Sequence, residues 1–290
     1  MNNEIKTNIN WFPGHMRKSL NELQASLKNI DAVICVLDAR APYSCINPEL
    51  EKICLGKNII YAINKNDLAD STITKLWEQY FKEKGKTVLR IDATKNSCKS
   101  AVINAINIAT KSKQEKMKSR GFLMKIRVAI VGVPNTGKST LLNTLAGGYL
   151  SKTGNIAGVT RSSSWIKLDK WLELMDNAGT LVPKFSDTFV AENLAILGTI
   201  GERATDYESL AIIVAERLKV IAKDKLSSRY EIEICDKDSG EDIVQKIAKA
   251  RGFILKGGEI DKQRASTALV DDFRKTRIGK ISLEVPSNIN

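Results

Sequence analysis

Four short hydrophobic segments rich in β-branched residues divide the first half of the chain. They cover residues 31–39, 57–64, 86–94 and 125–132, and each ends in polar or turn-forming residues. Apolar runs of this length are typical of strands buried on both faces of a sheet. Between the second and third segments, residues 71–85 place large apolar side chains at helical spacing and stop at a glycine. The alternation of strands and helices predicts an α/β fold with a mostly parallel sheet.

The pattern changes in the second half of the chain. Residues 163–179 alternate polar and apolar positions around a break, which predicts a hairpin. From residue 184 onward the spacing is helical, with Ser239 and Asp261 as predicted N-caps. We therefore expect an α/β domain over residues 1–183, followed by a smaller helical C-terminal domain over residues 184–290.

The composition is that of an ordinary globular protein, with 43% hydrophobic and 27% charged residues. The apolar runs are far shorter than the roughly eighteen residues that a membrane helix needs. The first ten residues lack the basic start and apolar core of a signal peptide. The five cysteines show no C-x-x-C spacing, which is typical of reduced, buried thiols. These features predict a cytoplasmic protein without a membrane partner.

The net charge of +12 is unevenly distributed. Residues 1–183 hold 27 basic and 15 acidic side chains (27 − 15 = +12), whereas residues 184–290 hold 18 of each (18 − 18 = 0). Within the second part, an acidic segment, 184–245, precedes a basic one, 246–290. A basic excess suits a polyanionic partner such as RNA. The alternative is an ordinary solvated surface rich in lysine.

The sequence GVPNTGKST at residues 132–140, the phosphate loop, fits the motif G-x-x-x-x-G-K-[ST] between a predicted strand and a predicted helix. Its glycines allow backbone N–H groups to point at phosphate oxygens, and the helix N-terminus adds partial positive charge. Lys138 is expected to reach the β- and γ-phosphates, and the Ser139 hydroxyl to ligate Mg²⁺. The other expected nucleotide contacts in this loop are Asn135, Thr136, Gly137 and Thr140.

The tetrapeptide NKND at residues 64–67, the base-reading loop, has the N-K-x-D form that distinguishes guanine from adenine. Asp67 can accept hydrogen bonds from guanine N1–H and the 2-amino group, and buried pairing of this kind discriminates strongly. The Lys65 side chain is expected to lie across the base, and Asn64 to tie this loop to the phosphate loop. A second base loop is expected at the end of the next strand, at Asp92, Ala93 and Thr94. In this second base loop, the Ala93 N–H is expected to meet guanine O6.

Two further segments complete the expected set of loops. Thr160, in a glycine-flanked segment, is expected to complete the Mg²⁺ shell. In the sequence DNAG at 176–179, Asp176 can hold Mg²⁺ through water, and the Gly179 N–H can sense the γ-phosphate.

The order of these motifs is unusual, because the base-reading loop precedes the phosphate loop. An ordinary GTPase loop set gives this order when the chain is cut between the second switch and the base-reading loop. Chain termini often lie close together, so such a rotation can preserve a fold. The charged segment 111–121, a predicted linker or exposed helix, then joins the former ends. We expect a circularly permuted P-loop GTPase domain that binds GTP or GDP with Mg²⁺.

The chain resembles the circularly permuted GTPases, most closely the bacterial ribosome biogenesis GTPase A family. The resemblance spans nearly the whole chain and implies a cytoplasmic GTPase that acts late in assembly of the large ribosomal subunit. It also implies that the C-terminal domain helps to bind ribosomal RNA. The segments that carry it are WFPGHMRK (11–18), NKND, GVPNTGKST, GNIAGVT (154–160), DNAG and RGFILKGGEID (251–261).

The resemblance further implies residue roles. His15 is implicated in activating water, because GTPases of this kind lack the usual glutamine after the second-switch glycine. The alternative for His15, the only histidine, is a capped, packed residue beside Trp11 and Phe12. Asn135 matches GTPases that use K⁺ as an accelerating ion, whose charge acts like an arginine finger. The expected catalytic residues are His15, Lys138, Thr160 and Gly179.

The sequence departs from the family pattern in both switches. Ala157 and Ala178 stand where the family usually has proline, and Thr180 where it tends to have a bulky apolar residue. The loss of two residues with fixed φ is expected to loosen both loops, which bears on the rate of hydrolysis more than on nucleotide binding.

These departures leave an alternative function open, a GTP-gated RNA-binding module with negligible hydrolysis. A GTPase serving transfer RNA or membranes is a further rival, and the lack of an amphipathic or lipidated segment argues against membranes. An ATPase would leave Asp67 without a partner on the base. We expect a monomer that binds the precursor of the large subunit and its rRNA, and not DNA.

Overall fold

A computed structural model describes residues 14–122, 125–148, 164–176, 187–199 and 206–288, and describes their side chains except at residues 14–19, 164 and 288. Within these residues the chain forms a six-stranded sheet in the order β3-β2-β1-β4-β6-β5. Neighbouring strands are parallel except β5 and β6, which are antiparallel. The strands are β1 (Ala32–Asp38), β2 (Asn58–Asn64), β3 (Thr87–Arg90), β4 (Ile126–Val131), β5 (Ser164–Lys167) and β6 (Leu172–Asp176).

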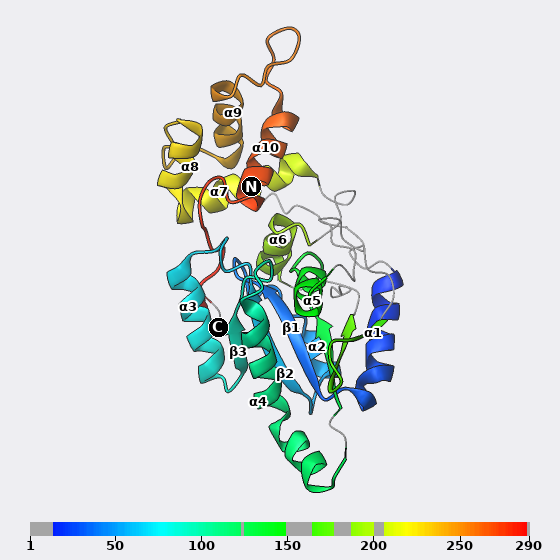
Figure 1. Ribbon diagram of the computed structural model, residues 1–290. Coiled ribbons are helices and arrows are strands. Elements are labelled where there is room, and N and C mark those ends of the chain that lie inside the picture. Colours follow the sequence, from blue (N-terminus) through cyan, green and yellow to red (C-terminus); the bar gives the residue numbers. More distant parts are fainter. Residues whose placement is uncertain (1–13, 123–124, 149–163, 177–186, 200–205, 289–290) are drawn as a thin grey trace.

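Helices cover both faces of the sheet, because side chains alternate along each buried strand. The odd-numbered residues 33–37 of β1 belong to a core that includes side chains of α1, α2 and α3. The even-numbered residues 32–36 belong to a second core, with side chains of α4 and α5. Figure 1 shows this layered arrangement. These helices are α1 (Gly14–Ser26), α2 (Pro48–Ile53), α3 (Ser71–Glu83), α4 (Cys98–Ser119) and α5 (Lys138–Ala146).

A group of helices follows the sheet at one end of the molecule, with α6 (Thr188–Ile196) between them and the strands (Figure 1). In this helical region α7, α9 and α10 pack against one another. The predicted cap at Ser239 is confirmed as a capping box with Asp242. The helices are α7 (Tyr207–Ile221), α8 (Lys223–Tyr230), α9 (Gly240–Ala250) and α10 (Lys262–Arg274).

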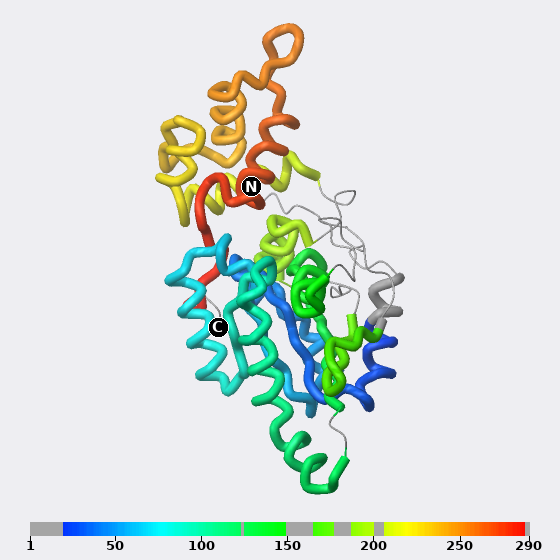
Figure 2. Tube along the Cα trace, in the orientation of Figure 1, coloured from blue at the N-terminus to red at the C-terminus, as the bar shows by residue number. Residues whose placement is uncertain are grey.

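The chain then returns to the sheet along residues 280–288, the C-terminal strap, which Figure 2 shows running from the helical region down to α3. Trp77 Nε1 donates to the Glu284 carbonyl at 3.1 Å. The buried Glu284 carboxylate accepts from Ser44 Oγ at 2.6 Å and from Asn193 Nδ2 at 3.2 Å. The strap therefore joins α3, α6 and the loop after β1.

The predicted α/β class, the mostly parallel sheet and the hairpin of β5 and β6 are confirmed. In segment 111–121, residues 111–119 form the last part of α4, whose first part, residues 98–110, was not predicted from the sequence. The first part buries Val102 and Ile106 against the sheet, whereas none of the described residues 111–122 is buried. The proposed domain boundary at 183–184 lies outside the described residues.

Candidate functional site: three loops at the carboxyl edge of the sheet

The phosphate loop lies between β4 and α5, as the sequence predicts. Gly132 and Gly137 have φ values of 141° and 96°, which favour glycine. A Cβ at Gly137 would lie 2.3 Å from Asn64 Nδ2, and one at Gly132 would lie 2.5 Å from the Val36 carbonyl oxygen. The backbone conformation and the close packing of the loop therefore both require glycine at these two positions.

Lys138 is buried at the first residue of α5, and its Nζ donates to the Val133 carbonyl of the same loop at 2.8 Å. Burial lowers the pKa of Lys138 to about 8, although the charge of Asp176 acts in the opposite direction. An anionic phosphate beside this ammonium would raise the pKa again, because an opposite charge favours the protonated form. The position is thus suited to binding phosphate oxygens.

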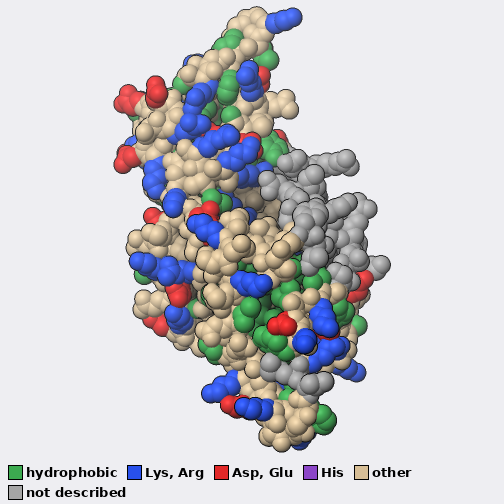
Figure 3. Space-filling view, viewed as in Figure 1, with side chains coloured by type: hydrophobic (Ala, Val, Ile, Leu, Met, Phe, Trp, Pro, Cys, Tyr) green, Lys and Arg blue, Asp and Glu red, His purple; other side chains and the backbone are tan. Residues whose placement is uncertain are grey.

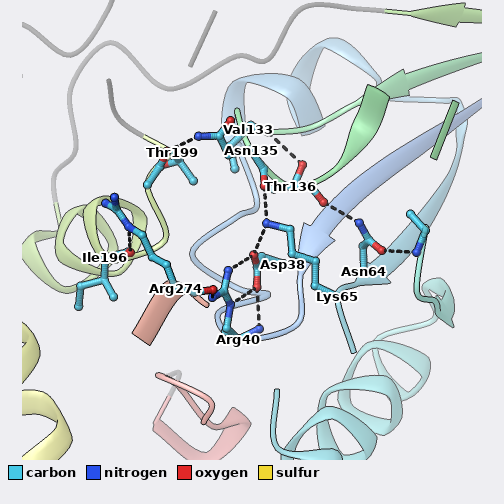
Figure 4. A network of polar contacts seen from close by, with 12 residues as sticks. Asp38, Arg40, Asn64, Lys65, Val133, Asn135, Thr136, Ile196, Thr199 and Arg274 are labelled. Carbon is cyan, nitrogen blue, oxygen red and sulfur yellow. Dashed lines mark hydrogen bonds and ion pairs between the residues drawn. The ribbon is translucent and has the colours of Figure 1, made fainter. Parts of the chain in front are cut away.

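Asn64, the last residue of β2, joins three loops at this edge (Figure 4). Its Nδ2 donates to the Thr136 carbonyl of the phosphate loop at 2.8 Å, and its Oδ1 accepts from the Ala93 N–H at 2.9 Å. Both bonds are buried, and buried polar side chains are expected to be satisfied in this way. Thr144 of α5 adds a further link, since its Oγ1 donates to the Ala93 carbonyl at 2.6 Å.

The arrangement of the second base loop differs from expectation at two points. The Ala93 N–H, expected to meet guanine O6, donates to Asn64. Asp92 accepts from the N–H and hydroxyl of Thr94 at 3.0 and 2.5 Å, and it pairs with Lys95 at 3.2 Å. In this structure Asp92 and Thr94 therefore shape their own turn.

Lys65 bridges the base-reading loop and the phosphate loop. Its Nζ donates to the Asn135 carbonyl at 2.5 Å and pairs with Asp38 at 3.0 Å. Lys65 and Asn135 both have a φ of 61°, so the two contacting residues share the left-handed conformation. Asp67 follows two residues after Lys65 and is half-buried. The ends of β2 and β4 thus bring the two predicted loops into direct contact.

Asp38 and Arg40 form a buried pair that the sequence reading missed. Arg40 Nε and Nη2 donate to the two carboxylate oxygens of Asp38 at 2.9 and 2.8 Å, a bidentate geometry. Burial alone would raise the pKa of Asp38, but the charges of Arg40 and Lys65 hold it well below its usual range. The available signal was a D-x-R pair whose Asp38 ends a buried strand, at the edge where an α/β sheet places its ligand loops.

The residues expected to hold Mg²⁺ lie partly within the described chain. Asp176 is buried at the end of β6, close enough to Lys138 to influence its pKa, and Ser139 lies in the first turn of α5. One buried carboxylate and a hydroxyl beside a phosphate loop suit Mg²⁺, which prefers few protein ligands together with phosphate oxygens. Within the described residues, no group of three or more His, Cys, Asp or Glu side chains could hold a metal.

Several predicted residues lie outside the described part. Thr160 and Gly179, and the positions that depart from the family pattern, Ala157, Ala178 and Thr180, fall in segments 149–163 and 177–186. His15 lies in α1, in a turn whose side chains are not described. Thr140 lies half-buried in α5. Roles in catalysis and in sensing the γ-phosphate stay predictions for these residues.

The chain is similar to known proteins over nearly its whole length. A family model described as "50S ribosome-binding GTPase" matches residues 127–239. A protein of Bacillus licheniformis named ribosome biogenesis GTPase A is 37% identical over 97% of this chain and 99% of its own. One of Bacillus cereus with the same name is 37% identical over 96% of this chain and 94% of its own.

Solved structures show the same architecture. A GDP-bound structure of YlqF matches with a TM-score of 0.65 and 25% identity, covering 92% of this chain and 99% of that one. A GNP-bound YlqF from Thermotoga maritima matches with a TM-score of 0.63 and 25% identity, covering 93% and 98% of the two chains. The similarity therefore extends over the helical region as well as the sheet.

Proposed function

The chain belongs to the ribosome biogenesis GTPase A family and is a GTPase, and from this premise we propose that it acts late in assembly of the large (50S) ribosomal subunit by binding rRNA. The observation that carries the nucleotide site is the junction at Asn64, which holds the base-reading loop, the second base loop and the phosphate loop together. Guanine specificity is assigned to Asp67, at the same edge.

We propose GTP and Mg²⁺ as the ligands at this carboxyl edge of the sheet. In this proposal Lys138 would contact the β- and γ-phosphates of bound GTP, and Ser139, Asp176 and Thr160 would hold Mg²⁺. Mg²⁺ held there would supply positive charge that offsets the negative charge developing on the phosphates during hydrolysis. The proposed contacts to base and phosphates come from Asn64, Lys65, Asp67, Ala93, Asn135, Thr136, Gly137, Lys138, Ser139, Thr140 and Gly179, while Asp92 and Thr94 hold the turn of the second base loop.

The proposed catalytic group comprises His15, Lys138, Thr160 and Gly179. His15 orients the attacking water, and the Gly179 N–H senses the γ-phosphate. The proposed K⁺ site uses Asn135, whose backbone and side chain are both held in place: its carbonyl accepts from Lys65, and its Nδ2 donates to the Gly198 carbonyl.

The proposed RNA contact lies on the helical region, where Lys and Arg side chains gather on the face shown in Figure 3. Lys249, Arg251 and Lys256 are exposed at the end of α9 and in the loop that follows it. Ile254 and Leu255 beside them are 48% and 49% exposed. Cationic side chains around exposed apolar ones suit a phosphate backbone with accessible bases. No helix in the described part of the chain is long and apolar enough to cross a membrane.

Phosphate release from GTP in potassium buffer, with and without purified large ribosomal subunits, tests the proposal. Strong stimulation by the subunits supports a ribosome-assembly GTPase. GTP-dependent binding to the subunits without stimulated release supports the alternative, a GTP-gated RNA-binding module. A matched reaction with ATP in place of GTP controls for nonspecific hydrolysis and checks the guanine preference.

A further inference from the structure

Two loops of the nucleotide site are connected to the same residue of the helical region, Arg274, the last residue of α10 (Figure 4). We propose that Arg274 is a positioning residue for the guanine-nucleotide site, because it holds the base-reading loop through one set of contacts and the phosphate loop through another. The inference rests on the proposed nucleotide site and adds a part of the chain that the loop motifs do not include.

The first set of contacts starts at the base-reading loop. Lys65 pairs with Asp38, which binds the Arg40 guanidinium with both carboxylate oxygens. Arg40 Nη1 donates to the Arg274 carbonyl oxygen at 3.2 Å. The Arg40 guanidinium also lies over the Phe273 ring, 5.6 Å from its centroid. Because Asp38 and Arg40 are 1% and 3% exposed, a shift at the end of α10 is expected to move a rigid, close-packed pair.

The second set starts at the phosphate loop. Asn135 Nδ2 donates to the Gly198 carbonyl, two residues after the end of α6. The Arg274 side chain binds that helix end, with Nε donating to the Ile196 carbonyl and Nη2 to the Ala195 carbonyl, each at 2.9 Å. A Cβ at Gly198 would lie 3.1 Å from the Arg274 guanidinium carbon, so the contact is close.

The geometry of the Arg274 guanidinium explains why this position uses arginine. Nη1 donates to the Tyr207 hydroxyl at 3.0 Å, while Nε and Nη2 bind the two carbonyls of α6. A cation at a helix C-terminus also interacts favourably with the helix dipole. Lysine keeps the charge but cannot form this planar set of three contacts. Arg274→Lys is therefore expected to preserve the fold and only part of the positioning.

The dissociation rate of a fluorescent GDP analogue, chased with excess GDP, measures the effect on the full-length protein. Arg274→Met is expected to speed dissociation about tenfold, a loss of about 1.4 kcal/mol, and Arg274→Lys about threefold. Arg229→Met is the matched control, because Arg229 also binds α10, through Asp272 at 2.9 Å, but contacts neither loop. Its dissociation rate is expected to stay within twofold of the wild type, with thermal melts showing that each variant is folded.

A double-mutant comparison separates positioning from a general loss of packing. In a background of Asn135→Ala, which cuts the connection that the Arg274 side chain supports, adding Arg274→Met is expected to change the dissociation rate less than twofold. A tenfold effect that persists in this background overturns the proposal, as does a wild-type rate for both Arg274→Met and Arg274→Lys. A wild-type protein that does not bind the GDP analogue overturns the proposed nucleotide site itself, before any variant is compared.

Discussion

Asp67 is the residue on which the assignment of guanine depends. Its carboxylate is expected to accept a hydrogen bond from the 2-amino group, and a hydrogen bond to a charged group contributes about 1.5–3 kcal/mol. Wild-type protein should therefore bind GDP about ten- to a hundredfold more tightly than inosine diphosphate, which lacks that amino group. In Asp67→Asn this preference should disappear, as measured by titration with both nucleotides.

Asp92→Asn is the control for that experiment. It also removes a carboxylate at the carboxyl edge of the sheet, but Asp92 binds Thr94 and Lys95 of its own turn. This variant should keep the preference for GDP over inosine diphosphate. Loss of the preference in Asp92→Asn, with retention in Asp67→Asn, would contradict the assigned base contact and move it to the second base loop.

Single residues could be predicted where chemistry imposes a motif. Gly137 belongs to the phosphate-loop motif and Asn64 to the N-K-x-D motif. The structure brings the two residues into contact, as the close packing at Gly137 shows. Asp38 and Arg40 were missed because they belong to none of the motifs that the sequence displays. Only the fold shows that both side chains are buried and meet Lys65 and α10.

At the scale of elements, the hydrophobic pattern predicted the buried strands but not the long-range connections. The first part of α4 went unassigned because its apolar residues do not mark a single face: Val102 and Ile106 are buried, whereas Ile108 is exposed. The C-terminal strap could not be foreseen, since Glu284 contacts Ser44, 240 residues earlier in the chain. No local periodicity encodes a contact at that separation.

The strap predicts a specific dependence of stability on pH. Burial raises the pKa of Glu284 from 4.5 to about 7, although hydrogen bonds from Ser44, Tyr43 and Asn193 oppose the shift. The folded protein therefore binds a proton between pH 4.5 and 7 that the unfolded chain releases, so this contribution grows as pH falls through that range. Relative to Glu284→Gln, the wild type should gain up to about 3 kcal/mol of unfolding free energy between pH 7 and pH 4.5.

Urea unfolding of both proteins at several pH values measures this difference. Asp272→Asn is a control of opposite sign: although burial would raise it, Arg277 and Arg229 hold the pKa of Asp272 below its usual range. The contribution of Asp272 should therefore be lost as pH falls. A constant difference between wild type and Glu284→Gln from pH 4.5 to 7 would contradict the expected titration of the strap.

At the scale of the whole molecule, the connection through Arg274 places the helical region and the nucleotide loops in one packed network. A partner that binds the helical region is then expected to change the affinity for the nucleotide, because it can shift the end of α10 relative to α6. The coupling is reciprocal, so the bound nucleotide should also change the affinity for that partner. The position of the partner on the protein therefore determines whether its binding is coupled to nucleotide binding.

Two basic surfaces at different places in the chain offer a matched test of that location. One is Lys249, Arg251 and Lys256 in the helical region, and the other is Lys116, Lys118 and Arg120 at the exposed end of α4. Each neutralised phosphate contact contributes about 0.7–0.9 to the slope of log K against log salt concentration. Replacing the first three residues with glutamine should lower the slope for purified large-subunit rRNA by about 2–3, whereas replacing the second three should leave it unchanged.

The comparison is informative because both triple variants remove the same charge from the same protein. A nonspecific attraction of rRNA to the net charge of +12 would lower both slopes equally, which would contradict a contact at the helical region. A lower slope only for the α4 variant would place the rRNA at the opposite end of the sheet, away from Arg274. A lower slope only for the helical-region variant would place it where binding can reach both nucleotide loops.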